Sequence, residues 1–244
     1  MIRPVIAAFG AAAILGTTLA AQASDSAPPR PWKLQTDFGF VNTAGNTSTT
    51  TLNAGENFSY TTGPWTFAQL FAVVYGKTEG EKSAENYAAN LRGDYAIDDH
   101  FGIYALGKWD RDEFAGISRR FEEGGGLAFK PIAQGRTTLS FEAGVSANQQ
   151  RSTEGVEDTY ASGRGAVLFK QVFATRAYFQ QTGEILPNLK NSDDYRVNTE
   201  TALVAPLSKS IAFKASYVIK FDNDPEPGFK KTDRFLTSGL QIVF

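Results

Sequence analysis

From about residue 33 to its last residue, the chain alternates apolar and polar positions with the period of two that is typical of β-strands. The segment 210–222 is the clearest, because Ile211, Phe213 and Tyr217 share one face while Lys214 and Lys220 share the other. Prolines and Gly/Asn/Asp turns separate such segments, since proline cannot donate a ladder hydrogen bond. The pattern predicts twelve strands, over residues 33–43, 47–61, 65–78, 83–96, 100–113, 119–130, 136–150, 156–169, 172–184, 193–204, 210–222 and 231–244.

The predicted connections fall into two classes. Twelve is an even number, as a single-chain bacterial barrel with both termini on one side requires. Tight turns at 62–64, 97–99, 131–135, 170–171 and 205–209 alternate with looser links at 114–118, 150–155, 185–192 and 223–230. The first hairpin, at 44–46, is short although it should lie with the looser links. The fold class expected is all-β, an antiparallel up-and-down transmembrane β-barrel with short periplasmic turns.

The last strand carries a second indication of this class. Leu236, Leu240, Ile242 and the terminal Phe244 fall on one face of the segment 234–244. A final amphipathic strand that ends on an aromatic residue resembles the signal by which outer-membrane barrels are recognised for insertion. We therefore expect Leu240, Ile242 and Phe244 to form a membrane-insertion signal read by the barrel-assembly machinery, and expect the strands to close into a barrel because no strand edge can stay unpaired in hydrocarbon.

The amino terminus has the layout of a secretory signal peptide. Arg3 is its only charge, an apolar, Ala-rich run follows, and Ala21-Gln22-Ala23 precedes Ser24. We expect residues 1–23 to be a cleaved signal peptide, 24–32 a periplasmic leader and 33–244 the barrel, located in the outer membrane of a Gram-negative bacterium.

Composition narrows the classes further. Mean hydropathy is −0.26, and a barrel hides its membrane affinity by alternation, so a low average does not exclude it. There is no cysteine, and hence no disulfide framework. The net charge of −2 becomes −3 when Arg3 is removed, which argues against nucleic acid as a partner because the basic excess that neutralises phosphates is missing.

Alternation alone does not decide which face is outside, since a soluble periplasmic or secreted barrel that binds an apolar ligand has the same periodicity. Twelve strands, however, enclose more space than ordinary side chains fill easily, and a polar, charged lumen resolves that difficulty. Outer-membrane lipid is then the expected partner. The residues expected to line this lumen are Asp37, Arg92, Asp94, Lys108, Asp110, Arg120, Glu122, Glu142, Arg164, Arg176, Arg196, Glu200, Lys214 and Lys220.

Two segments fit this scheme less well. The segment 65–78 is apolar on both faces, and we place the face with Trp65, Phe67 and Phe71 outward. In 47–61 the parity that sends Leu52 to lipid also sends Glu56 there, at a cost of up to a few kcal/mol near mid-membrane. Either a bulge shifts the register at Glu56 or the assigned parity is wrong.

The first hairpin adds a resemblance. Residues 39–55, reading Gly-Phe-Val-Asn-Thr-Ala-Gly-Asn-Thr-Ser-Thr-Thr-Thr-Leu-Asn-Ala-Gly, resemble the opening motif of a bacterial family of unknown function whose members are described as salt-induced outer-membrane proteins. The layout of signal peptide, hairpins and terminal Phe244 extends the resemblance over essentially the whole chain. It implies an outer-membrane β-barrel and an envelope role under osmotic or salt stress, and it supplies no catalytic residues.

Catalysis and metal binding have little support in the sequence. His100 is the only histidine and lies in a predicted periplasmic turn, far from where an outer-membrane lipase would need it. The acids at 222–226 are interrupted by proline and do not match a calcium loop. We expect no enzyme activity, cofactor or metal. The lumen charges leave two interpretations open, a narrow channel that selects small solutes by charge and an occluded barrel fixed by ion pairs.

Overall fold

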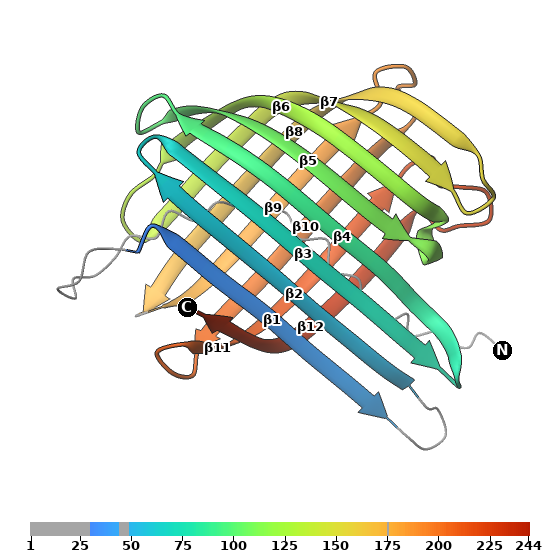
Figure 1. Cartoon of the computed structure of the whole chain (residues 1–244), viewed down its shortest axis with the longest axis horizontal. Coiled ribbons are helices and arrows are strands. Elements are labelled where there is room, and N and C mark those ends of the chain that lie inside the picture. Colours follow the sequence, from blue (N-terminus) through green and yellow to red (C-terminus); the bar gives the residue numbers. More distant parts are fainter. Residues whose placement is uncertain (1–29, 44–48, 175) are drawn as a thin grey trace.

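The computed structural model describes residues 30–43, 49–174 and 176–244, which form one closed barrel of antiparallel strands (Figure 1). The predicted all-β fold with twelve strands is therefore confirmed. The predicted signal peptide and the 44–46 hairpin turn lie outside the described residues. The elements are β1 (Trp32–Thr43), β2 (Thr49–Thr62), β3 (Trp65–Thr78), β4 (Glu81–Ala96), β5 (Phe101–Asp112), η1 (Glu113–Ala115), β6 (Ile117–Ile132), β7 (Thr137–Ser152), β8 (Glu157–Ala174), β9 (Ala177–Pro187), β10 (Tyr195–Pro206), β11 (Ile211–Asp222) and β12 (Thr232–Val243).

Each strand pairs with its neighbours in sequence, and β1 pairs with β12 to close the ring. We call the end at which β1 begins and β12 finishes the terminal end, and the opposite one the distal end. Among the described residues, no helix is long and apolar enough to cross a membrane.

The two faces of the wall differ as the alternation predicts. On β3, Phe67 and Phe71 are exposed on the outside, whereas Leu70 and Val74 are buried inside. On β11, Phe213 and Tyr217 are exposed while Ala212 and Val218 are buried. Because side chains alternate strictly along a strand, one correctly assigned residue fixes the face of all the others until a bulge intervenes. The outside of the barrel is consequently apolar.

Proline acts at strand ends and at a bulge. Pro187 and Pro206 are the last residues of β9 and β10. Pro131, expected between strands, instead lies within β6, where the register with β7 shifts between Phe129 and Ile132. A residue without an N–H group is tolerated there because a bulge leaves one residue out of the ladder.

The predicted turn at 170–171 is wrong. Lys170 and Gln171 lie within β8, which continues to Ala174 and pairs with β9 through Lys170 and Gln171. The strand is longer than expected because the chain continues for five more positions, 170–174, without a turn residue. The chain reverses between Ala174 and Ala177, where Arg176 has a φ of 113°.

Glu56 lies on the outer face without a bulge. It sits opposite Thr36 on β1 and the exposed Phe71 on β3, and both registers run unbroken through it. The assigned parity of this strand therefore holds, and the carboxylate stays on the apolar side of the wall.

Candidate functional site in the lumen

The lumen gathers most of the charge that the sequence places on one face of the strands. All of the predicted lumen-lining residues except Arg176 take part in ion pairs inside the barrel. Several are nearly inaccessible to solvent, among them Glu122 and Arg92 with exposed fractions of 3% and 5%. The interior is thus polar and densely paired.

Arg176 does not line the lumen, and the prediction that it does is wrong. It lies in the turn between β8 and β9, is exposed, and donates a hydrogen bond to the backbone carbonyl of Lys209 in the next turn along this end. The error follows from the strand boundary, because a turn assigned at 170–171 puts Arg176 inside a strand with inward parity.

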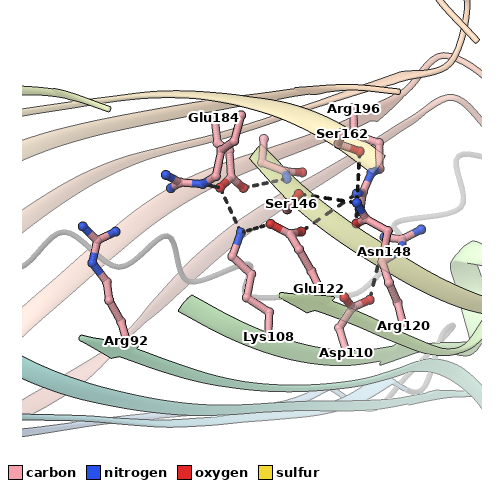
Figure 2. Close-up of polar contacts among 12 residues, drawn as sticks. Arg92, Lys108, Asp110, Arg120, Glu122, Ser146, Asn148, Ser162, Glu184 and Arg196 are labelled. Carbon is pink, nitrogen blue, oxygen red and sulfur yellow. Dashed lines mark hydrogen bonds and ion pairs between the residues drawn. The ribbon is translucent and has the colours of Figure 1, made fainter. Parts of the chain in front are cut away.

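Eight residues form one chain of alternating charge across the lumen, which we call the central ion chain. Its middle is Arg164 on β8, whose Nε lies 2.7 Å from Glu184 and whose Nη1 lies 2.6 Å from Glu142. Lys108 on β5 continues it, with Nζ 2.9 Å from Glu184 and 3.2 Å from Glu122 (Figure 2). The order along the chain is Asp94, Arg92, Glu142, Arg164, Glu184, Lys108, Glu122 and Arg196.

An aromatic ring supports the middle of this chain. The guanidinium carbons of Arg92 and Arg164 lie 4.5 Å and 5.1 Å from the ring centroid of Tyr104, and Arg164 also donates to the Tyr104 hydroxyl at 2.8 Å. Gly144 makes room for that hydroxyl, since a Cβ at Gly144 would lie only 2.5 Å from it. The two guanidinium groups are therefore fixed by carboxylates and by a π-face together.

Some of these contacts span the barrel rather than follow its wall. Lys108 and Glu184 come from β5 and β9, which are four strands apart in the ring. Lys220 on β11 reaches Asp112 on β5, the strand directly opposite in the ring of twelve, at 3.4 Å. Side chains from distant walls of the barrel therefore meet across the lumen at two places.

The distal mouth carries a further cover. Glu226, in the link between β11 and β12, accepts a hydrogen bond of 2.8 Å from Gln150 on β7. In the same link Phe229 packs against Gly116, where an added Cβ would lie 2.7 Å from the ring. Beneath this cover lies a cavity of about 150 Å³, whose lining includes the basic Arg120, Arg196 and Lys220 and the acidic Asp110, Asp112 and Asp233.

A smaller network lies nearer the terminal end. Lys214 on β11 pairs with Asp37 on β1 at 3.5 Å and with Glu200 on β10 at 3.4 Å. Gln241 on β12 donates to Asp37 at 3.1 Å. This cluster ties together the strands on both sides of the point where the barrel closes.

Sequence reasoning missed two members of the lumen network. Glu184 is the last residue of the predicted strand 172–184. In the structure β9 continues to Pro187, and Glu184 is buried within the barrel. Asp112 shares the parity of Lys108 and Asp110 and could have been assigned from alternation alone. Each of these carboxylates forms an ion pair with a lysine on a strand that is not its neighbour in the barrel.

His100 lies in the turn between β4 and β5. Backbone N–H groups of Phe101 and His100 donate to the carboxylate of Asp98, each at 2.7 Å, and thereby lower the pKa of Asp98. Within the described part of the chain, no group of three histidine or acidic side chains is arranged as a candidate metal site. The backbone of this turn is thus ordered by Asp98.

Comparison with known proteins gives a family and distant structural similarity. The model of a family described as "Protein of unknown function, DUF481" matches residues 36–244. The uncharacterized protein YdiY of Escherichia coli is 20% identical over 212 residues, which cover 86% of this chain and 82% of YdiY. The translocator domain of the autotransporter NalP from Neisseria meningitidis aligns with a TM-score of 0.48 at 10% identity over 90% of each chain. An anion-selective porin from Comamonas acidovorans aligns with a TM-score of 0.40 at 8% identity, over 87% of this chain and 98% of the porin.

Proposed function

The chain belongs to the family of unknown function whose model it matches, and we propose that it is an integral outer-membrane β-barrel of the Gram-negative envelope with a lumen closed by ion pairs. One observation carries this proposal, the reversed polarity of the wall. Phe38, Leu127 and Leu236 have exposed fractions of 58%, 64% and 63% on the outside, while Arg92, Glu122 and Arg164 are buried within. Such a surface is stable against lipid and costly in water.

Aromatic side chains near both ends of the barrel support a membrane-spanning band. Trp65 stacks on Phe67 and meets Tyr95 edge to face at the terminal end. Tyr195 and Phe221, with ring centroids 5.7 Å apart, lie at the distal end. Aromatic girdles at the two interfaces are a feature of outer-membrane barrels. The short terminal-end turns then face the periplasm and the distal links face outward.

The polar interior disfavours the soluble alternative. A barrel that binds an apolar ligand needs an apolar lumen, whereas this lumen holds the central ion chain and the Lys214 cluster. The same contacts favour an occluded barrel over an open pore. A role under salt stress rests on the family resemblance. A small-solute channel is the second candidate function, because high ionic strength screens ion pairs such as these and so weakens them.

Conductance of the refolded protein in planar bilayers tests the closed lumen. At about 0.1 M salt, where the Debye length is about 10 Å, we expect a silent barrel whose gel mobility changes on heating. Current steps that appear only near 1 M salt, with charge selectivity, would support the channel. Stable open steps at low salt would overturn the closed lumen, and recovery of the native protein in the soluble periplasmic fraction would overturn the membrane barrel itself.

A further inference from the structure

The join between β1 and β12 is far shorter than the other joins of the barrel. Four residue pairs connect these strands, from Gln35 with Val243 to Phe38 with Leu240, whereas twelve connect β1 to β2. Within the described ranges 30–43 and 232–244, β1 pairs no further toward the distal end. Figure 1 shows β1 and β12 diverging there, each still paired to its neighbour on the other side.

The strands part just beyond two glycines. A Cβ on Gly239 would lie 2.5 Å from the carbonyl oxygen of Phe38, and one on Gly39 would lie 2.8 Å from that of Ser238. The two backbones thus approach closely at the level of these glycines and separate from there toward the distal end. In hydrocarbon an unpaired strand edge leaves polar groups unsatisfied. The distal half of this seam therefore needs an occupant that offers both apolar surface and hydrogen-bonding groups.

A cavity of about 120 Å³, which we call the seam cavity, lies where the pairing stops. Phe38 and Leu240, the last pair of the ladder, line it together with Phe71, and all three are exposed on the lipid-facing side. Its inner lining includes the polar Asp37, Glu200, Lys214, Gln180 and Gln241 together with the buried Leu70, Ala72 and Ala202. Apolar and polar linings meet at one gap in the wall.

The charges of the seam cavity indicate the kind of head group that fits. Lys214 is already shared between Asp37 and Glu200, and Glu56 adds a third carboxylate to the lining. The side-chain carboxylate of Glu56 forms no hydrogen bond or ion pair with any described residue. Carboxylates outnumber the cation, so an anionic head group is repelled. The amides of Gln180 and Gln241 can serve as both donors and acceptors.

We propose that the distal half of the β1–β12 seam is a lateral binding site for a zwitterionic membrane amphiphile. The acyl chain lies between Phe38, Leu240 and Leu236 on the outside, and the head group enters the seam cavity toward Lys214 and Asp37. This proposal rests on the membrane location proposed above. It gives the barrel a route between lumen and lipid that does not use the occluded axis.

Photo-labelling of the refolded wild-type protein tests the site. The probe is phosphatidylcholine with a diazirine beside its head group, in vesicles of phosphatidylcholine, and labelled residues are identified by mass spectrometry. We expect labels on the inward-facing Ser216 and Thr237, which line the seam cavity. The equally buried Ser146 and Ser162 lie behind fully paired strands and serve as internal controls.

The outcomes separate the two proposals. Labels on outward residues such as Leu127, with none on Ser216 or Thr237, would overturn the lateral site and leave the membrane barrel intact. Absence of label on outward residues would overturn the membrane barrel. Labelling of Ser146 and Ser162 as strongly as Ser216 would show that the probe enters along the axis, which contradicts a lateral route.

Cysteine pairs measure the opening itself, because the chain has no native cysteine. Thr36 and Ile242 are register partners, so the variant T36C/I242C should form a disulfide within the folded barrel. Asn42 and Leu236 would be partners if the same register continued, and N42C/L236C should stay reduced. A disulfide in N42C/L236C as complete as in the control would overturn the open seam. A disulfide between two chains of the single variant L236C would show that a second copy of the protein, and not an amphiphile, occupies the seam.

Discussion

The ammonium nitrogen of Lys220 on β11 lies 3.4 Å from the carboxylate of Asp112 on β5, the strand opposite it in the ring. Asp112 is also held by Asn86 on β4, whose amide donates to it at 2.8 Å. A second contact across the lumen joins Lys108 on β5 to Glu184 on β9 and also to Glu122. In the closed lumen proposed above, these two contacts form two barriers in series.

Barriers in series make a specific prediction about conductance. Lys220→Ala and Lys108→Ala should each remain silent at about 0.1 M salt, because one barrier persists, whereas the double variant should show current steps. Arg119→Ala, which removes an exposed rim pair with Glu157, is the control and should change nothing. Steps from either single variant would show that the two levels do not act in series.

Arg164 should be the most costly charge to remove. Its guanidinium is bound by Glu184, Glu142 and Tyr104, and truncation removes one of the two cations that hold each of these carboxylates. We expect Arg164→Met to lower the free energy of unfolding by about 3 kcal/mol, the cost of breaking a buried pair. Urea unfolding followed by gel mobility measures it. Arg119→Met should stay within about 0.5 kcal/mol, and an equal effect at both sites would contradict a structural role for the central ion chain.

Substitutions at two glycines distinguish the effect of side-chain packing on stability from the effect of backbone flexibility. A Cβ at Gly144 would overlap the carbonyl oxygen of Gly125 and crowd the Tyr104 hydroxyl, whereas one at Gly107 would meet nothing within 4 Å. We expect Gly144→Ala to destabilise the barrel by about 1–3 kcal/mol and Gly107→Ala to be neutral or slightly stabilising. The temperature at which the folded gel band disappears is the readout. A tolerated Gly144→Ala would mean that Tyr104 is not held by this glycine.

Glu56 offers a test of the outer face. Its carboxylate lies between Thr36 and Phe71 on the apolar side of the wall. Replacing it with leucine should raise the free energy of unfolding in lipid by about 1 kcal/mol, since acidic residues on the lipid face cost less than the ~2–4 kcal/mol of basic ones. Glu157→Leu at the exposed rim is the control. Loss of stability in Glu56→Leu would show that the carboxylate has a partner in the membrane.

Alternation was enough to predict the strand number and the inward position of residues such as Arg92 and Lys108. The period of two is local, so each residue's face follows from that of its neighbour. The end of β8 could not be predicted in the same way. The pattern of 156–169 continues past Lys170 without a turn residue, so nothing local marks where the strand ends, and the turn wrongly assigned at 170–171 misplaced Arg176.

The partners of the lumen charges needed the three-dimensional structure. Lys108 meets Glu184 across 76 residues of sequence, and which strands face each other depends on the cross-section of the closed barrel. The seam is more remote still, since Asp37 and Gln241 are 204 residues apart. No local pattern shows that pairing between β1 and β12 stops at Phe38.

The carboxy-terminal residue gives the last prediction. Phe244 is more than half exposed and follows β12, and its backbone N–H donates to the Leu34 carbonyl at 3.0 Å, which fixes the end of the chain against β1. The side chain contributes little to the interior, so a barrel already folded should tolerate Phe244→Ala. If the terminal aromatic is an insertion signal, the same variant should assemble poorly in cells while refolding normally from urea into detergent. Phe141→Ala, at an aromatic within β7 that is 45% exposed against 55% for Phe244, is the control for lost lipid contact. Normal assembly of Phe244→Ala in cells would contradict the signal, and failure to refold in detergent would assign the residue to barrel stability instead.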